Sequence, residues 1–267
     1  MDSVIFPVGI HHTAIIHPTA KLGKDVSVGP YAIIDAETEI GDGCQIGAHA
    51  TVHRYTHLGK NCKLFPACSI GADPQDLKFV GEVTHTWIGD NCTFRECATV
   101  NRGCGIDSET RIGNNCLMMA YTHVAHNCIV GNNVIMSNVA TLAGHVVVED
   151  RAVIGGLAAV HQFTHIGRNA MIGGMARIAQ DVPPFMICAG DPAFVSGLNS
   201  VGISRAGIPA EEVSELKKAF RMLYMRGLKV DEAIAQMEAE LTQFDTLKHL
   251  INFLRTAERG IIRTRKK

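Results

Sequence analysis

An apolar residue at every sixth position is the feature that most restricts how this chain can fold. The series covers residues 10–178, and of its 29 positions only Asp76 and Glu82 are not apolar. A second series lies two residues before the first; over residues 14–176 it contains only Ala, Val, Thr or Cys, apart from Pro74. Side chains two apart in a strand face the same side. Each hexad therefore predicts a short strand with one small and one larger apolar side chain turned inward.

Stacked hexads of this kind predict a parallel β-helix, in which each turn of chain covers the one before. Glycine often follows the apolar residue directly, as at Gly41 and Gly131, and we attribute it there to a turn. The two exceptions fall within the segment ADPQDLKFVGE, which we predict to leave the coil as an external loop near residues 72–84. Two consecutive prolines at 183–184 end the ladder near residue 182, because proline has no N–H to donate.

The hexads end at residue 184, so we divide the chain into a β-helix domain, 1–184, and a C-terminal domain, 185–267. Apolar residues in the second part recur at spacings of three and four, which predicts a small α-helical domain. Three helices are expected, over 209–226, 231–242 and 245–257. Asp231 and Asp245 are the predicted N-caps of the last two.

The chain has nine cysteines, and seven of them occupy the small inward position of the hexad. We therefore expect them to pack as small hydrophobic residues, without disulfides and without a zinc site. The seven are Cys44, Cys62, Cys68, Cys92, Cys104, Cys116 and Cys128.

Charge and hydropathy exclude several classes of partner. Lysine and arginine total 25 against 26 acidic residues, so no overall charge points to nucleic acid. The charge is uneven, with a net −4 over 1–184 and +3 over 185–267, and the basic part is suited to an acidic protein partner. No apolar run is long enough to span a bilayer, and the first residues do not have the pattern of a signal peptide. We expect a cytoplasmic protein with no membrane span.

Histidines and a glycine gather where the hexads stack. If each turn takes three hexads, residues 18 apart lie above one another, about 4.8 Å apart. His126, Gly144 and Gln162 then form one column. His161 lies in the column before it and His145 in the column after it. These side chains lie outside the inward positions, so they converge at one corner of the coil.

Several stretches together resemble the acyl-carrier-protein-dependent UDP-N-acetylglucosamine O-acyltransferases of lipid A biosynthesis. The resemblance covers nearly the whole chain, and HVAHNC (123–128) with LAGHV and VHQF is its most specific part. The other matching stretches are IIHPTA (15–20), PQDLKF (74–79), DVPPF (181–185), GLNSVGISRAG (197–207) and RGIIR (259–263).

That resemblance implies a left-handed β-helix and a homotrimer with active sites between subunits. We expect no cofactor, and no metal, because inward cysteines and outward histidines leave no four-ligand tetrahedral set. The implied reaction moves a 3-hydroxyacyl group from acyl carrier protein to the 3-hydroxyl of UDP-N-acetylglucosamine. His126 is implied as the general base and the Gly144 N–H as the donor to the oxyanion; both fit the chemistry, since imidazole titrates near neutral pH and glycine leaves its N–H unobstructed. The implied binding residues are Asp76, Lys78, His123, His145, His161, Gln162, Asn199 and Arg205, and Gly174 is implied to limit acyl-chain length.

Some questions stay open at this stage. Asn127 follows the proposed base where many relatives carry aspartate, so what orients His126 is not settled. The acceptor group could be a 3-hydroxyl or a 3-amine, and the acyl length is open. The alternatives are an N-acyltransferase of the same pathway, a coenzyme A-dependent hexapeptide acetyltransferase, a γ-type carbonic anhydrase with zinc held by histidines, and a purely structural solenoid.

Overall fold

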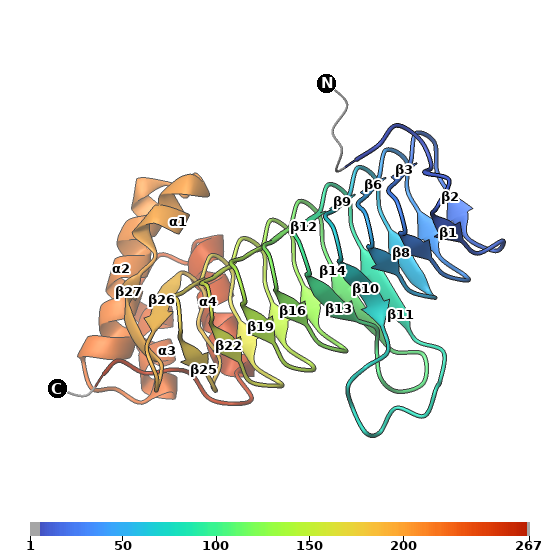
Figure 1. Ribbon diagram of the computed structural model, residues 1–267. Helices are drawn as coiled ribbons and strands as arrows, with labels where there is room; N and C mark the ends of the chain where they lie inside the picture. The colour runs from blue at the N-terminus through green and yellow to red at the C-terminus, as the bar shows by residue number, and fades with distance from the viewer. Residues whose placement is uncertain (1–5, 266–267) are drawn as a thin grey trace.

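The computed structural model describes residues 6–265, and the ends of both predicted domains, 1–5 and 266–267, lie outside that part. Hexads stack into a long three-sided prism, and helices lie at its far end (Figure 1). Strand n pairs in parallel with strand n+3, so each turn contributes one strand to each of three sheets. The predicted β-helix is confirmed.

Each sheet forms one face of the prism. The first sheet contains β1 (Ile15–Ile16), β4 (Ile33–Ile34), β7 (Thr51–Val52), β10 (Ser69–Ala72), β13 (Thr99–Asn101), β16 (His123–Val124), β19 (Thr141–Leu142), β22 (Ala159–Val160) and β25 (Arg177–Ile178). The second contains β2 (Lys21–Leu22), β5 (Glu39–Ile40), β8 (Thr56–Leu58), β11 (His85–Ile88), β14 (Glu109–Ile112), β17 (Ile129–Val130), β20 (Val147–Val148) and β23 (His165–Ile166). The third contains β3 (Ser27–Val28), β6 (Gln45–Ile46), β9 (Lys63–Leu64), β12 (Thr93–Phe94), β15 (Leu117–Met118), β18 (Ile135–Met136), β21 (Val153–Ile154), β24 (Met171–Ile172), β26 (Met186–Ala189) and β27 (Phe194–Leu198).

The core is a column of inward side chains along the prism axis. Six of the seven cysteines predicted to be inward are buried, among them Cys62, Cys92 and Cys128, and no disulfide joins any of the nine cysteines. Burial raises the pKa of the Cys128 thiol to about 12, so it is protonated at neutral pH and packs as an apolar group.

Two insertions interrupt the regular coil, and both leave it between the first and second sheets. The predicted loop is present between β10 and β11, at residues 73–84, and projects from the side of the prism (Figure 1). A second, unpredicted loop lies between β13 and β14, at residues 102–108. His85 pairs with Glu109, 24 residues on, whereas undisturbed turns advance by 18. The placement of Cys104 and Ile106 in the inward series was therefore wrong. Cys104 is half-buried in this loop, and Ile106 is exposed.

The glycines that follow the apolar residues have a different role from the one expected. The left-handed backbone conformation falls two residues later than these glycines: Gly43, after Gly41, has φ of 69°, and Asn133, after Gly131, has φ of 57°. At Gly41 a Cβ would lie 2.6 Å from the carbonyl oxygen of Gly59 in the next turn. Close stacking of the coils, and not the turn, therefore requires glycine there.

Strand pairing continues past the prolines: β26 pairs with β24, and β27 folds back antiparallel to β26. The helices are α1 (Ser200–Arg205), α2 (Ala210–Met225), α3 (Val230–Glu240) and α4 (Asp245–Thr256). Three were predicted and α1 was not. The N-caps are Lys229 and Phe244, so the predicted caps Asp231 and Asp245 were wrong; both lie in the first turn, where their charge still favours the helix. None of the helices in the described part of the chain is long and apolar enough to cross a membrane.

Candidate active site

One edge of the prism collects most of the predicted site residues. The chain crosses from the first sheet to the second at residues 73–84, 102–108, 125–128, 143–146 and 161–164 on successive turns. His126, Gly144 and Gln162 therefore stack on this edge, as predicted from their spacing of 18. The two external loops leave from the same edge on the turns just before, and we call this edge with its loops the histidine edge.

Asn127 determines which nitrogen of His126 carries the proton. The Cys104 backbone N–H donates to Asn127 Oδ1 (3.0 Å), and Asn127 Nδ2 donates to the Cys104 carbonyl (3.2 Å). These two bonds fix the orientation of the amide, because a backbone N–H can only donate and a carbonyl can only accept. Asn127 Oδ1 lies 2.8 Å from His126 Nδ1, so Nδ1 must be the protonated nitrogen. The lone pair is then on His126 Nε2.

The imidazole of His126 lies against the backbone of Gly144. A Cβ on residue 144 would be 2.6 Å from both Cε1 and Nε2 of His126, so only glycine fits beside the ring. Among residues 6–265, no acceptor takes a hydrogen bond from the Gly144 N–H. His145 meets His126 edge-on, with ring centroids 5.3 Å apart, and stacks on Phe163 at 4.7 Å. Burial, followed by the neighbouring His126, lowers the pKa of His145.

The 73–84 loop carries a carboxylate to His126. Asp76 Oδ2 lies 3.7 Å from His126 Nε2, while Asp76 Oδ1 accepts the backbone N–H of Lys78 at 2.9 Å. The side chain of His126 is 12% exposed and that of Asp76 28% exposed, so both are largely covered but reach the surface. Lys78 itself is exposed on the loop.

The two loops are tied to each other. Arg102 is buried, forms an ion pair with Asp73 at 2.7 Å, and lies over the rings of Tyr55 and Phe79. Glu82 accepts the backbone N–H of Gly105 at 2.7 Å, and this bond lowers the pKa of its carboxyl group. These contacts hold the 102–108 loop beside His126.

His123 lies in β16, two positions before the first residue of the edge, and its Nδ1 is 2.8 Å from Thr99 Oγ1. Burial, and then the proximity of His126, lowers the pKa of His123, which favours its neutral form. His161 and Gln162 are exposed on the same edge, with His161 Nδ1 3.1 Å from the Gln162 carbonyl oxygen.

The remaining three predicted residues lie elsewhere in the chain. Gly174 is exposed on the edge between the third and first sheets. A Cβ added at this position would lie 3.2 Å from the Gly156 carbonyl oxygen. Asn199 is buried: it caps α1 by accepting from Gly202 and donates to the Asn169 carbonyl at 2.8 Å, on the edge between the second and third sheets. Arg205 ends α1 and is exposed. One chain therefore does not bring these three to His126, and their roles stay predictions.

Sequence reasoning missed Cys104, Arg102 and the orienting role of Asn127. Cys104 joins Asp76 and His126 in a group of three potential metal ligands whose donor atoms lie within 4.8 Å of one another. The expectation from the sequence, that no four-ligand tetrahedral set would form, treated Cys104 as an inward residue and so did not foresee this group of three. Gly103 and Gly105 on either side of this cysteine, and Asp107 shortly after it, were the available signal of a loop.

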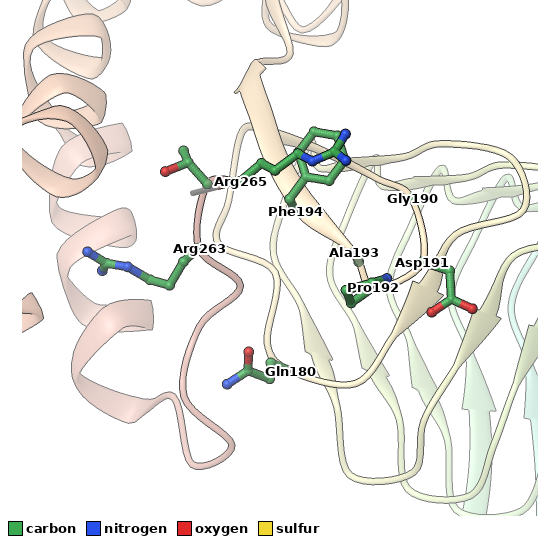
Figure 2. Close-up of a pocket in the computed structure, with 9 residues that line it drawn as sticks. Gln180, Gly190, Asp191, Pro192, Ala193, Phe194, Arg263 and Arg265 are labelled. Carbon is green, nitrogen blue, oxygen red and sulfur yellow. The ribbon is translucent and has the colours of Figure 1, made fainter. Parts of the chain in front are cut away.

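A cavity of about 470 Å³ lies near the C-terminus; it is lined by residues 190–194 and 263–265 and by Gln180, which follows β25 on the next turn of the histidine edge. Figure 2 shows Arg265 lying along the ring of Phe194, while Arg263 points away toward the helices. No residue predicted for the site lines it.

Nearly the whole chain is similar to proteins of known structure. A solved UDP-N-acetylglucosamine acyltransferase from Bacteroides fragilis superposes with a TM-score of 0.93 at 38% identity, over 95% of this chain and 99% of that one. One from Campylobacter jejuni superposes with a TM-score of 0.89 at 37% identity, over 96% and 100% of the two chains. Residues 19–54 and 109–144 match the family model for bacterial transferase hexapeptide repeats. The chain is a hexapeptide-repeat acyltransferase, and its coil is a left-handed β-helix.

Residues 181–262 match the family model described as UDP N-acetylglucosamine O-acyltransferase, domain 2. Proteins named acyl-(acyl-carrier-protein)–UDP-N-acetylglucosamine O-acyltransferase are 56% identical in Sulfurihydrogenibium sp. strain YO3AOP1, over 95% of this chain and 94% of that protein, and 54% identical in Trichlorobacter lovleyi, over 96% and 100%. The chain belongs to this family of O-acyltransferases.

Proposed function

We propose that this protein transfers a 3-hydroxyacyl group from acyl carrier protein to the 3-hydroxyl of UDP-N-acetylglucosamine, the first step of lipid A biosynthesis. In support, relatives that match this chain over almost their full length are named as O-acyltransferases that use acyl-(acyl-carrier-protein) and UDP-N-acetylglucosamine. The observation that carries the proposal is His126, whose free Nε2 lies directly beside the backbone of Gly144. A base and an oxyanion donor that lie side by side can act on the attacking hydroxyl and on the carbonyl oxygen of the thioester.

The chemistry takes two steps. His126 Nε2 accepts the proton of the sugar hydroxyl as its oxygen attacks the thioester carbonyl, and the Gly144 N–H donates to the oxyanion that forms. The intermediate then collapses, the C–S bond breaks, and the imidazolium returns its proton to the departing thiolate of the carrier protein. The transfer is direct, with no acyl-enzyme intermediate and no cofactor.

The other predicted residues are assigned to binding. Asp76 and Lys78 on the loop, together with His123, His145, His161 and Gln162, surround the reacting centre and contact the sugar. Asn199 and Arg205 of a neighbouring subunit would contact phosphates, and Gly174 would leave room for a long acyl chain. Because a single chain separates these groups onto different edges, we propose that the protein is a homotrimer. We also propose that it is located in the cytoplasm.

A product assay tests the function. The purified protein is mixed with UDP-N-acetylglucosamine and 3-hydroxyacyl carrier proteins of several chain lengths, and products are identified by mass spectrometry. We expect one acylated nucleotide sugar, whose ester bond hydroxylamine cleaves, and turnover that falls as salt rises because an acidic carrier is attracted to the basic C-terminal part. Turnover of acetyl-coenzyme A equal to that of the 3-hydroxyacyl carrier protein would refute the carrier protein as the specific acyl donor. A product bond that resists hydroxylamine would indicate a 3-amine acceptor.

A further inference from the structure

Three side chains of different chemistry point at one another beside the proposed catalytic base. The carboxylate of Asp76, the thiol of Cys104 and the imidazole of His126 have donor atoms within 4.8 Å of one another. They come from three successive turns of the histidine edge: the 73–84 loop, the 102–108 loop and the corner after β16. Cys104 has no role in the transfer chemistry proposed above.

Each of the three is held by its own neighbours. His126 Nδ1–H donates to Asn127 Oδ1, which is the arrangement that metal-binding histidines require, since it directs the Nε2 lone pair outward. The same Asn127 amide forms hydrogen bonds with both the N–H and the carbonyl of the Cys104 backbone. The Lys78 N–H occupies Asp76 Oδ1, and Oδ2 therefore faces His126. Asn127 thus positions two of the three side chains at once.

The three donor atoms, all within 4.8 Å of one another, lie close to the spacing around a tetrahedral ion. Zinc bonds of about 2.0–2.3 Å to nitrogen, oxygen and sulfur place neighbouring ligand atoms roughly 3.3–3.7 Å apart. His126 Nε2 and Asp76 Oδ2 already lie 3.7 Å apart. Three protein ligands leave a fourth position for water, which is open because the site lies at the surface. A thiolate among the ligands selects zinc or a similar soft cation over magnesium and calcium.

We propose that Asp76, Cys104 and His126 form a zinc-binding site whose occupation inhibits the transferase. A cation bound there takes the Nε2 lone pair that must otherwise accept the proton of the sugar hydroxyl. Binding displaces the thiol proton of Cys104 to solvent, so the bound sulfur is a thiolate. The inhibition rests on the proposed function, but the metal site itself does not.

Cobalt titration tests the site without any substrate. Co²⁺ bound to a thiolate gives a sulfur-to-metal charge-transfer band, which we expect for the unmodified protein and for Cys97→Ser. Cys97 is the matched control, because it is also a half-buried free cysteine and lies outside the ligand group. Cys104→Ser should abolish the band, and Asp76→Asn should weaken Co²⁺ binding. A band that survives Cys104→Ser, or one lost in Cys97→Ser, overturns the site.

Zinc inhibition tests the consequence. Loss of even an outer ligand partner lowers metal affinity by roughly 10- to 100-fold, so Cys104→Ser should raise the zinc concentration for half-inhibition by at least about tenfold. Its turnover in the presence of a chelator should match that of the unmodified enzyme. Equal zinc sensitivity of both proteins refutes the inhibitory role. If transferase activity is absent altogether while the cobalt band behaves as expected, the proposed function fails and the metal site stands.

Discussion

At the scale of single residues, Asn127 supplies what an aspartate would otherwise give to His126. An amide oxygen fixes the tautomer, as a carboxylate would, but brings no negative charge to stabilise the imidazolium. Replacement of Asn127 by Leu removes this hydrogen bond and releases Cys104, and we expect kcat to fall by roughly 100-fold or more, within the range that a general base contributes. Asn127→Asp should retain most activity, and steady-state kinetics of both variants measure the difference. If the leucine variant is as active as the aspartate variant, Asn127 does not orient the base.

His123 and His126 should differ in the kinetic constant that they affect. His126→Ala should fold normally, because the side chain adds little to the core, and its kcat should fall by roughly 10²- to 10⁴-fold. His123→Ala should mainly raise KM, since its ring is held by Thr99 beside the reacting centre. Kinetics and a melting curve for each variant test this. Near-normal kcat in His126→Ala would remove the catalytic assignment.

Some of this site could be predicted from the sequence. The stacking of His126 on Gly144 follows from the period of six once each turn is taken as three hexads, because residues 18 apart then meet. The contacts of Asn127 with Cys104 could not be predicted, since they depend on how a loop folds back over the next turn. Loop conformation is set by contacts such as those of Arg102 and Glu82, which no period records.

At the scale of elements, the period of six predicts one of the two external loops and misses the other. The loop at 73–84 was visible because it places Asp76 and Glu82 at positions that are otherwise apolar. The loop at 102–108 was concealed, because an insertion of one hexad leaves the phase unchanged and Cys104 and Ile106 happen to match the pattern. A pattern of residue types cannot distinguish an inward cysteine from one in a loop of the same phase.

Glu149, after β20, joins the β-helix to α4. Its carboxylate accepts from His249 at 2.6 Å and from the Arg168 backbone N–H at 2.7 Å, and lies 2.9 Å from His165 Nε2. Burial opposes the charged form, but the contacts with His165 and His249 outweigh it and lower the pKa from 4.5 to about 2. A carboxyl group with a lowered pKa stabilises the fold above its unfolded pKa, and that contribution is lost as the pH falls from about 4.5 toward 2.

Glu149→Gln should therefore destabilise the protein by about 2–3 kcal/mol at pH 7. The difference from the unmodified protein should shrink by about half or more at pH 3, where the unmodified carboxylate has lost most of its advantage. Chemical denaturation at both pH values measures it. A difference that stays constant with pH would show that the substitution acts through packing and not through the charge of Glu149.

At the scale of the whole molecule, the three edges of the prism carry different parts of the proposed site. His126 lies on the edge between the first and second sheets, Asn169 with the cap of α1 on the next edge, and Gly174 on the third. In one straight prism these three edges stay apart. When identical prisms pack side by side, one edge of a copy can face a different edge of its neighbour, and residues from two edges then meet. The period of six separates His126 and Gly174 onto different edges, but it gives no position to the cap of α1 and does not show which surfaces meet.

Subunit mixing tests whether neighbouring copies share a site. His126→Ala and Arg205→Ala should each be nearly inactive as pure trimers. In trimers assembled at random from equal amounts of both, about a quarter of the sites pair an intact His126 with an intact Arg205 from the next subunit, so about that share of activity should return. Mixing His126→Ala with the double variant should return none. Mass spectrometry confirms that mixed trimers have formed. If they have and no activity returns, the two residues do not serve one site across a subunit boundary.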